Sequence, residues 1–131
     1  MATFLLDTSV IIDAINEKKN RRLFLRELVS AGHVLACCPV NVSEVYSGVR
    51  PQEETRTNGL LRSLEYFPIT FPVAEMAGLL KRDYSKKGKS LSLTDTIIAA
   101  VAIHNRLSLI TDNAKDFPMK ELQLYPLPAE S

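Results

Sequence analysis

The sequence predicts a three-layer α/β/α domain, in which a parallel sheet of four or five strands lies between two layers of helices. The chain has 131 residues, which suits a single domain spanning residues 1–131. Short apolar runs alternate along the chain with longer segments of helical periodicity. No internal repeat or linker interrupts this alternation, which is typical of parallel strands joined by right-handed crossovers.

The first five elements follow from apolar patterning and from glycine and proline positions. A buried strand is expected at Thr3–Leu6, followed by a helix over Thr8–Ile15 whose isoleucines share a face. A second helix over Asn20–Ala31 is followed by a glycine that stops it. Val34–Cys38 is the next strand. A proline at the first turn then opens a helix over Pro39–Val49.

The second half of the chain continues the alternation. We expect a helix over Thr55–Tyr66 and an edge strand over Pro68–Phe71, because proline cannot donate a hydrogen bond to a central ladder. A helix opened by Pro72 ends in a basic turn at residues 86–89. The helix over Asp95–Asn105 is apolar nearly all round and should be buried, with Thr94 as its N-cap.

Three short elements complete the prediction. They are a strand at Leu107–Thr111, a turn or short helix over Asn113–Phe117, and a last strand at Leu122–Tyr125. Ligands of such sheets bind at the carboxyl ends of the strands, near the switch in strand order. Chemically active residues that directly follow the predicted strands are therefore candidates for a functional site.

Composition excludes several classes of protein. With 46% hydrophobic and 24% charged residues, the chain is expected to be a soluble globular protein. Its net charge of +1 gives no overall basic field, so contacts to nucleic acid would need local patches. The only cysteines, Cys37 and Cys38, are adjacent and offer no disulfide framework, which suits a reducing cytoplasm. We also expect no signal peptide and no membrane span.

Acidic residues follow the predicted strands. Asp7 comes directly after the first strand, Asp112 after the fourth, and Asp116 just beyond it. Asp95 begins the buried helix, and Glu44 lies one turn into the helix after the second strand. Carboxylates gathered at one sheet edge repel each other, and a divalent cation such as Mg²⁺ relieves that repulsion. A bound cation of this kind can activate water for phosphodiester hydrolysis.

Each acid also has a purely structural interpretation. Asp7 and Asp95 could be helix caps, Glu44 a solvated charge, Asp112 a turn residue and Asp116 a surface acid. A shared site explains five acids at one edge of the sheet better than five separate structural roles do. Small hydroxyls accompany the acids and could orient carboxylates or only form caps and turns: Thr8, Ser9, Thr94, Thr96 and Thr111.

Four segments in order resemble the motifs of the PIN-domain ribonucleases and, within them, the VapC-type toxins of bacterial and archaeal toxin–antitoxin pairs. They are FLLDTSVIID at residues 4–13, SEVYSG at 43–48, LTDTIIAA at 93–100 and LITDNAKDF at 109–117. The resemblance covers essentially the whole chain and implies a PIN-like, that is Rossmann-like, fold.

The resemblance also implies a set of site residues. Asp7 and Asp95 would be the main metal ligands, and Glu44 would complete the site directly or through water. The fourth acid would be Asp116 or Asp112, of which we favour Asp116 because it directly precedes Phe117. Supporting polar residues would be Thr8, Thr111, Asp112 and Asn113. The second motif departs mildly, because Cys38 replaces a common hydroxyl cap.

The implied activity is hydrolysis of RNA phosphodiester bonds with Mg²⁺ or Mn²⁺, by in-line attack of an activated water. The resemblance further implies a homodimer and a small cognate antitoxin, with which the chain could form a hetero-oligomer. An antitoxin segment would lie in an apolar groove beside Ile11, Ile15 and Phe24, although most of these residues could belong only to the core. Basic clusters at residues 18–22 and 81–89 could hold RNA phosphates, although solvated helix faces explain them equally well.

Other functions stay open at this point. The chain could be a PIN nuclease in RNA processing without a toxin role, or a binding module without catalysis. A phosphoaspartate enzyme on a similar sheet usually has a second acid two residues after the first, where this chain has Ser9. A nuclease acting on DNA flaps would need threading elements for which the chain looks too compact.

Overall fold

All five strands of the sheet are parallel, in the order β3-β2-β1-β4-β5. The computed structural model describes residues 1–128. Its elements, in chain order, are β1 (Thr3–Leu6), α1 (Thr8–Ile15), α2 (Arg21–Ser30), β2 (Val34–Cys37), α3 (Pro39–Ser47), η1 (Pro51–Glu53), α4 (Glu54–Ser63), β3 (Glu65–Tyr66), α5 (Phe71–Lys86), α6 (Leu93–Asn105), β4 (Ser108–Ile110), η2 (Ala114–Asp116) and β5 (Gln123–Tyr125). The predicted parallel sheet is therefore confirmed, with five strands.

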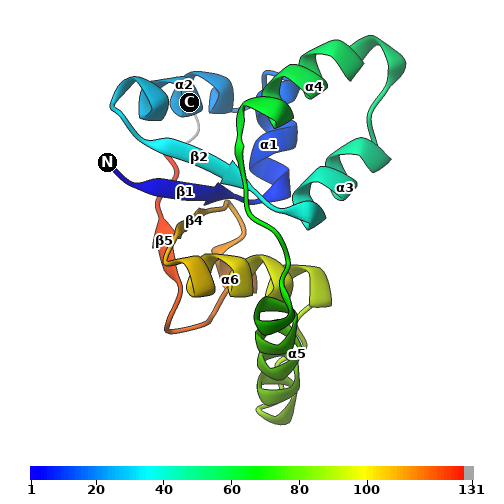
Figure 1. Ribbon diagram of the computed structural model, residues 1–131, viewed down its shortest axis with the longest axis vertical. Coiled ribbons are helices and arrows are strands. Elements are labelled where there is room, and N and C mark those ends of the chain that lie inside the picture. The colour runs from blue at the N-terminus through cyan, green and yellow to red at the C-terminus, as the bar shows by residue number, and fades with distance from the viewer. Residues whose placement is uncertain (129–131) are drawn as a thin grey trace.

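Two layers of helices cover the sheet. Helices α1, α2 and α4 lie on one face, and α5 and α6 lie on the other (Figure 1). Alternation along β1 divides the core accordingly: Leu5 packs with the α5–α6 side, whereas Phe4 and Leu6 pack with the α1–α2 side. The same alternation in β4 sends Leu109 and Ile110 to opposite cores.

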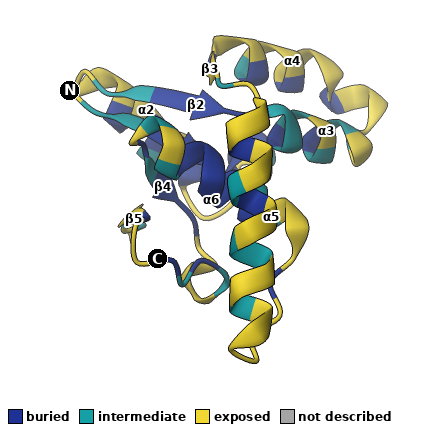
Figure 2. Ribbon diagram, turned by 60° about the horizontal axis from the view of Figure 1, so that its bottom comes forward, coloured by how far each residue is buried: buried dark blue, intermediate teal, exposed yellow. Residues whose placement is uncertain are grey.

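Helix α6 is buried along its middle. Residues 98 to 102 are at most 1% exposed, and Figure 2 shows α6 in dark blue beside the yellow outer face of α5. Its sequence, apolar nearly all round, predicted this position correctly. The depth of α6 matters for the site because it fixes the place of Asp95 in its first turn.

The third strand is shorter and earlier than its predicted position at Pro68–Phe71. Helix α4 ends at Ser63, and β3 pairs residues 65–66 with Ala36 and Cys37 of β2. The Phe67 amide still donates to the Cys37 carbonyl, at 2.9 Å. The ladder stops there because Pro68 has no N–H to donate. The predicted helix over Thr55–Tyr66 was thus too long at its end.

Two smaller features bear on the sequence predictions. Burial and, to a smaller extent, the neighbouring Cys38 raise the pKa of the Cys37 thiol to about 11, so the thiol stays protonated in its apolar surroundings. Among residues 1–128, no helix combines the length and apolar character that a membrane crossing requires.

Candidate active site

The acids gather at the carboxyl ends of β1 and β4, which are neighbours in the sheet. The chain leaves β1 toward β2 and β3 on one side and later returns to β4 on the other, so the strand order switches between β1 and β4. Asp7 follows β1 directly, and its amide donates to the Ile110 carbonyl at 2.9 Å. This bond fixes the backbone of Asp7 at the switch point.

Asp7 is both a helix cap and a buried carboxylate. Its side chain accepts from the Thr8 amide at 2.8 Å and from the Thr111 hydroxyl at 2.7 Å, and the residue is only 6% exposed. Burial raises the pKa of Asp7, and the charges of Asp95 and Asp112 raise it further, while the two hydrogen bonds lower it. Asp7 is therefore the N-cap of α1, as the structural interpretation of the sequence predicted. Capping alone does not explain why the other acids lie beside it.

Thr8 connects Asp7 to the second acid. Its hydroxyl donates to Oε1 of Glu44 at 2.6 Å and accepts from Nδ2 of Asn41 at 3.1 Å. Asn41 is fully buried, and its Oδ1 accepts from the Cys38 amide at 2.9 Å. These bonds set the position of Glu44 relative to α1. Asn41 also provides the reciprocal cap of α3 although Cys38 replaces a hydroxyl residue.

Asp95 lies in the first turn of α6, half-buried. The predicted N-cap Thr94 is wrong: the cap is Ser92, whose hydroxyl accepts from the Asp95 amide at 3.1 Å. The helix begins at Leu93, which places Thr94 and Asp95 inside its first turn. Burial raises the pKa of Asp95, a hydrogen bond with Ser92 lowers it, and the charges of Asp116 and Glu44 raise it.

The two acids after β4 occupy different environments. Asp112 accepts from the Ser9 hydroxyl at 2.9 Å and pairs with the Lys19 ammonium at 3.5 Å. Asp116 ends η2, half-buried, and its charge acts on Asp95. Within residues 1–128, the Asp116 side chain has no hydrogen bond or ion pair. Asn113 contributes its backbone amide, which donates to the Thr111 hydroxyl at 3.0 Å.

All five predicted acids therefore lie at one edge, although they form no ready-made cage. Among the described residues, no group of three or more His, Cys, Asp or Glu side chains is close enough to hold a metal ion as it stands. Mg²⁺ does not need such a group, since it is usually held by one or two carboxylates and keeps several waters. The available donors are carboxylate oxygens, which are the hard ligands that Mg²⁺ prefers. The carboxylates also repel one another, and a bound cation would relieve that repulsion. Asp7, Glu44, Asp95 and Asp116 thus have the donor chemistry that a divalent ion requires.

Sequence reasoning missed several contributors to this edge. Asn41 had a detectable signal, because it lies three residues after the N-cap, where a side chain can return to the cap amide. Asp13 and Lys19 had none, since the ion pairs of Lys19 with Asp13 and with Asp112 depend on the conformation of the loop between α1 and α2. Ser92 was hidden by the neighbouring Thr94.

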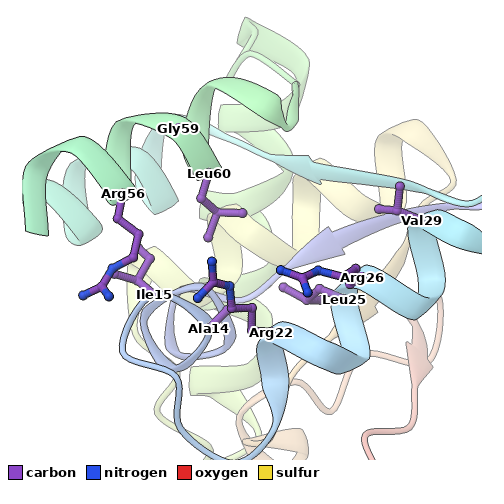
Figure 3. Close-up of a pocket in the computed structure, with 9 residues that line it drawn as sticks. All are labelled: Ala14, Ile15, Arg22, Leu25, Arg26, Val29, Arg56, Gly59 and Leu60. Carbon is purple, nitrogen blue, oxygen red and sulfur yellow. The ribbon is translucent and has the colours of Figure 1, made fainter.

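A groove of about 400 Å³ lies at the other end of α1 from Asp7. Figure 3 shows Leu60 of α4 and Arg22 of α2 pointing toward one another across it, with α1 at its base. Its lining residues are Ala14, Ile15, Arg22, Leu25, Arg26, Val29, Arg56, Gly59 and Leu60. Of the three residues expected beside an antitoxin groove, Ile15 is the one that lines this groove. Ile11 is fully buried in the core, and Phe24 packs near Tyr125 with ring centroids 6.3 Å apart.

The family model described as "PIN domain" matches residues 4–120. The chain belongs to the PIN-domain family. This match spans all four motifs and every acid of the site, so the resemblance predicted from the sequence is confirmed. In this PIN domain the acids lie at the switch point of a five-stranded parallel sheet.

Relatives of this PIN domain carry ribonuclease names. It is 28% identical over 115 residues to "Ribonuclease VapC19" of Mycobacterium tuberculosis, covering 88% of this chain and 92% of the relative. It is 37% identical over 92 residues to "Ribonuclease VapC10" of the same species, covering 70% and 68% of the two chains.

Solved structures share the fold. A chain in the crystal structure of VapBC2 from Rickettsia felis bound to a promoter DNA fragment matches with a TM-score of 0.82 at 23% identity, covering 94% of this chain and 97% of that one. A chain of a toxin–antitoxin complex from Klebsiella pneumoniae matches with a TM-score of 0.72 at 28% identity, covering 95% and 100%.

Proposed function

We propose that this PIN domain is a metal-dependent endoribonuclease and the toxin of a toxin–antitoxin pair. One observation carries the proposal: four separate segments bring carboxylates to the switch point, where burial and neighbouring charge raise the pKa values of Asp7 and Asp95. Such repulsion costs stability and is retained where a site needs it. The ribonuclease names of the relatives support RNA as the substrate.

The residues have distinct roles in this proposal. Asp7, Glu44, Asp95 and Asp116 would hold Mg²⁺ or Mn²⁺. When bound, the ion supplies an activated water and stabilises the departing oxygen of the phosphodiester. Thr111 holds one oxygen of Asp7 by a 2.7 Å hydrogen bond, and the Thr8 amide holds the other at 2.8 Å. The side chain of Asp7 therefore keeps one orientation, as a ligand or a phosphate-positioning group requires.

The assay for this function is cleavage of a labelled RNA in Mn²⁺ or Mg²⁺. We expect cleavage that excess EDTA stops and that Asp7→Asn abolishes with the fold intact, as judged by circular dichroism. Because loss of a group that only supports a metal ligand costs roughly 10–100-fold, loss of Asp7 itself should cost at least that much. Equal cleavage by the variant would contradict the proposed chemistry.

The groove supports the antitoxin part of the proposal. Its walls are apolar side chains of α1, α2 and α4, and three arginines line it: Arg22, Arg26 and Arg56. An amphipathic segment with an apolar face and nearby carboxylates would complement this surface. The similar Klebsiella structure is by its description a toxin–antitoxin complex, which agrees with a protein partner of that kind.

Toxin and processing nuclease are separated by expression in bacterial cells. We expect growth arrest on induction, relieved by Asp95→Asn or by coexpression of the antitoxin. RNA cleavage in vitro without growth arrest would instead favour the RNA-processing alternative, and neither activity would favour a silent binding module. The homodimer stays a prediction; exposed apolar residues available for it include Phe71, Leu79 and Leu93.

A further inference from the structure

The loop between α1 and α2 brings a lysine to the edge of the acid cluster. The Nζ atom of Lys19 lies 3.5 Å from Oδ2 of Asp112 and 3.6 Å from Oδ2 of Asp13. The three side chains are 16% to 38% exposed, so this ion pair is partly shielded from solvent. The Lys19 ammonium group therefore lies between the carboxylates of Asp112 and Asp13 at this side of the site.

The backbone of the loop holds this lysine in an uncommon conformation. Glu17, Lys19 and Asn20 all have φ values of 55° to 57°, in the left-handed region. Each residue in this conformation lowers the stability of the fold by on the order of 1 kcal/mol. Such residues persist where the surrounding structure holds the backbone in place, and they cluster at functional sites. The loop folds back so that the amide of Lys18 donates to the Asp13 carbonyl at 2.8 Å. The position of Lys19 is thus set by the main chain.

This lysine makes the two acids after β4 unequal. Both oxygens of Asp112 are engaged, one by the Ser9 hydroxyl and one by Lys19. The carboxylate of Asp116 has no such partner within residues 1–128, and it lies near Asp95. A divalent ion would have to displace Lys19 and Ser9 to recruit Asp112, whereas Asp116 needs no partner removed.

We propose that Lys19 is a positioning residue that pairs with Asp112 and Asp13, keeps Asp112 away from the divalent ion, and leaves Asp116 as the fourth acid of a single-ion site. The inference rests on the proposed function, because it assumes that the acids bind a divalent ion. It answers two points that the sequence left open, namely which acid completes the site and whether one ion or two are bound. The ammonium group takes the place at Asp112 that a second ion would otherwise occupy.

The test is Mn²⁺ binding to the apoprotein, followed by electron paramagnetic resonance of free Mn²⁺. We expect the wild-type chain to bind one ion. Asp116→Asn should weaken binding roughly tenfold or more, as loss of a ligand does, whereas Asp112→Asn should weaken it less than about threefold. In Lys19→Met the order should change, because Asp112 becomes available. There Asp112→Asn should weaken binding roughly tenfold.

Matched variants separate this role from general electrostatics. Lys18→Met removes the same charge from the neighbouring exposed residue and should leave the effect of Asp112→Asn unchanged. Lys19→Arg should restore wild-type behaviour. If Lys19 acted only by direct charge repulsion on the bound ion, independently of Asp112, the effects of Lys19→Met and Asp112→Asn on Mn²⁺ affinity would be additive. The double-mutant cycle would then show no coupling.

The outcomes distinguish the inference from the proposed function. Three results would overturn the role of Lys19 while leaving a metal site. They are additive effects of the two substitutions on Mn²⁺ affinity, two ions bound to the wild-type chain, or a larger loss of affinity from Asp112→Asn than from Asp116→Asn. No Mn²⁺ binding by the wild-type chain would overturn the metal site and, with it, this inference. Circular dichroism of each variant checks the fold, which we expect to be kept because the Lys19 side chain is 38% exposed.

Discussion

The hydroxyl of Thr8 donates a hydrogen bond to Oε1 of Glu44 at 2.6 Å and thereby joins α1 to α3. The two residues are 36 positions apart in sequence. Because Thr8 also follows the buried carboxylate of Asp7 and gives it an amide hydrogen bond, one residue fixes the relative placement of two acids. The predicted supporting role of Thr8 thus has a physical basis in these contacts.

Thr8→Val should lower RNA cleavage by roughly 10–100-fold, which is the usual effect of losing a partner that orients a metal ligand. The variant keeps the side-chain shape but leaves the buried Asn41 amide group without its acceptor, so we expect a destabilisation of about 1 kcal/mol. Cleavage kinetics and urea unfolding measure the two effects. Thr8→Ser keeps the hydroxyl and should retain most activity; equal activity of Val and Ser variants would show that the hydroxyl does not position Glu44.

Thr111→Val should displace the acidic limb of the pH–activity profile to higher pH. The Thr111 hydroxyl lowers the pKa of Asp7 by stabilising its ionised form, so its removal leaves burial and the neighbouring acids to raise that pKa further. Activity that needs ionised Asp7 is then lost at a higher pH. The measurement is initial cleavage rate between pH 5 and 9, with Thr111→Ser as the control. An unchanged acidic limb would mean that Asp7 does not govern it.

Asp95→Asn should raise the Tm of the metal-free protein at neutral pH. The pKa of Asp95 is raised on folding by burial and by Asp116 and Glu44, so the folded chain binds this proton more tightly than the unfolded chain does. Above the folded pKa the ionised group therefore costs stability. That cost fades as the pH falls through the folded pKa toward the unfolded value.

Differential scanning calorimetry at several pH values, with and without Mn²⁺, measures this effect. The wild-type Tm should rise with Mn²⁺ because the ion binds only the folded state, and the rise should be much smaller in Asp95→Asn. Glu121→Gln removes an exposed acid and serves as the control for net charge. A metal-free Asp95→Asn variant no more stable than wild type at neutral pH would show that the acids do not strain the fold.

Much of this site followed from the sequence because its acids sit beside strongly patterned segments. The apolar run before Asp7 predicted β1, and the continuous apolar stretch behind Asp95 predicted α6. The third strand was misplaced because Pro68–Phe71 is apolar, whereas β3 owes its existence to pairing with β2 at the sheet edge. A two-residue strand has too little pattern of its own to be found.

The sequence favoured Asp116 over Asp112 but gave no physical reason for the choice. Both follow β4 closely, and the local feature used to distinguish them was the place of Asp116 directly before Phe117. The difference comes from Lys19, which reaches Asp112 from a loop 93 residues away. The capping role of Asn41 had a local signal, but its contact with Thr8 spans 33 residues and had none. Tertiary contacts of polar side chains leave no periodic signal.

Reversal of the charge at Arg56 should weaken antitoxin binding without reducing RNA cleavage by the free chain. Arg56→Glu places a negative charge in the groove, where we expect acidic side chains of the partner, and about tenfold or more should be lost in affinity. Isothermal titration calorimetry with the antitoxin measures this. Arg62→Glu, exposed on the same helix outside the groove, is the control. Equal binding by both variants would place the antitoxin elsewhere.

The proposed function requires that the acids at the switch point hold a divalent ion. The most direct measurement is an anomalous difference map from a crystal soaked in Mn²⁺. We predict a peak between the carboxylates of Asp7 and Asp95, with Asp116 on the same ion. A map with no peak at these acids, or with Mn²⁺ bound only elsewhere on the chain, would show that the switch point is not a metal site.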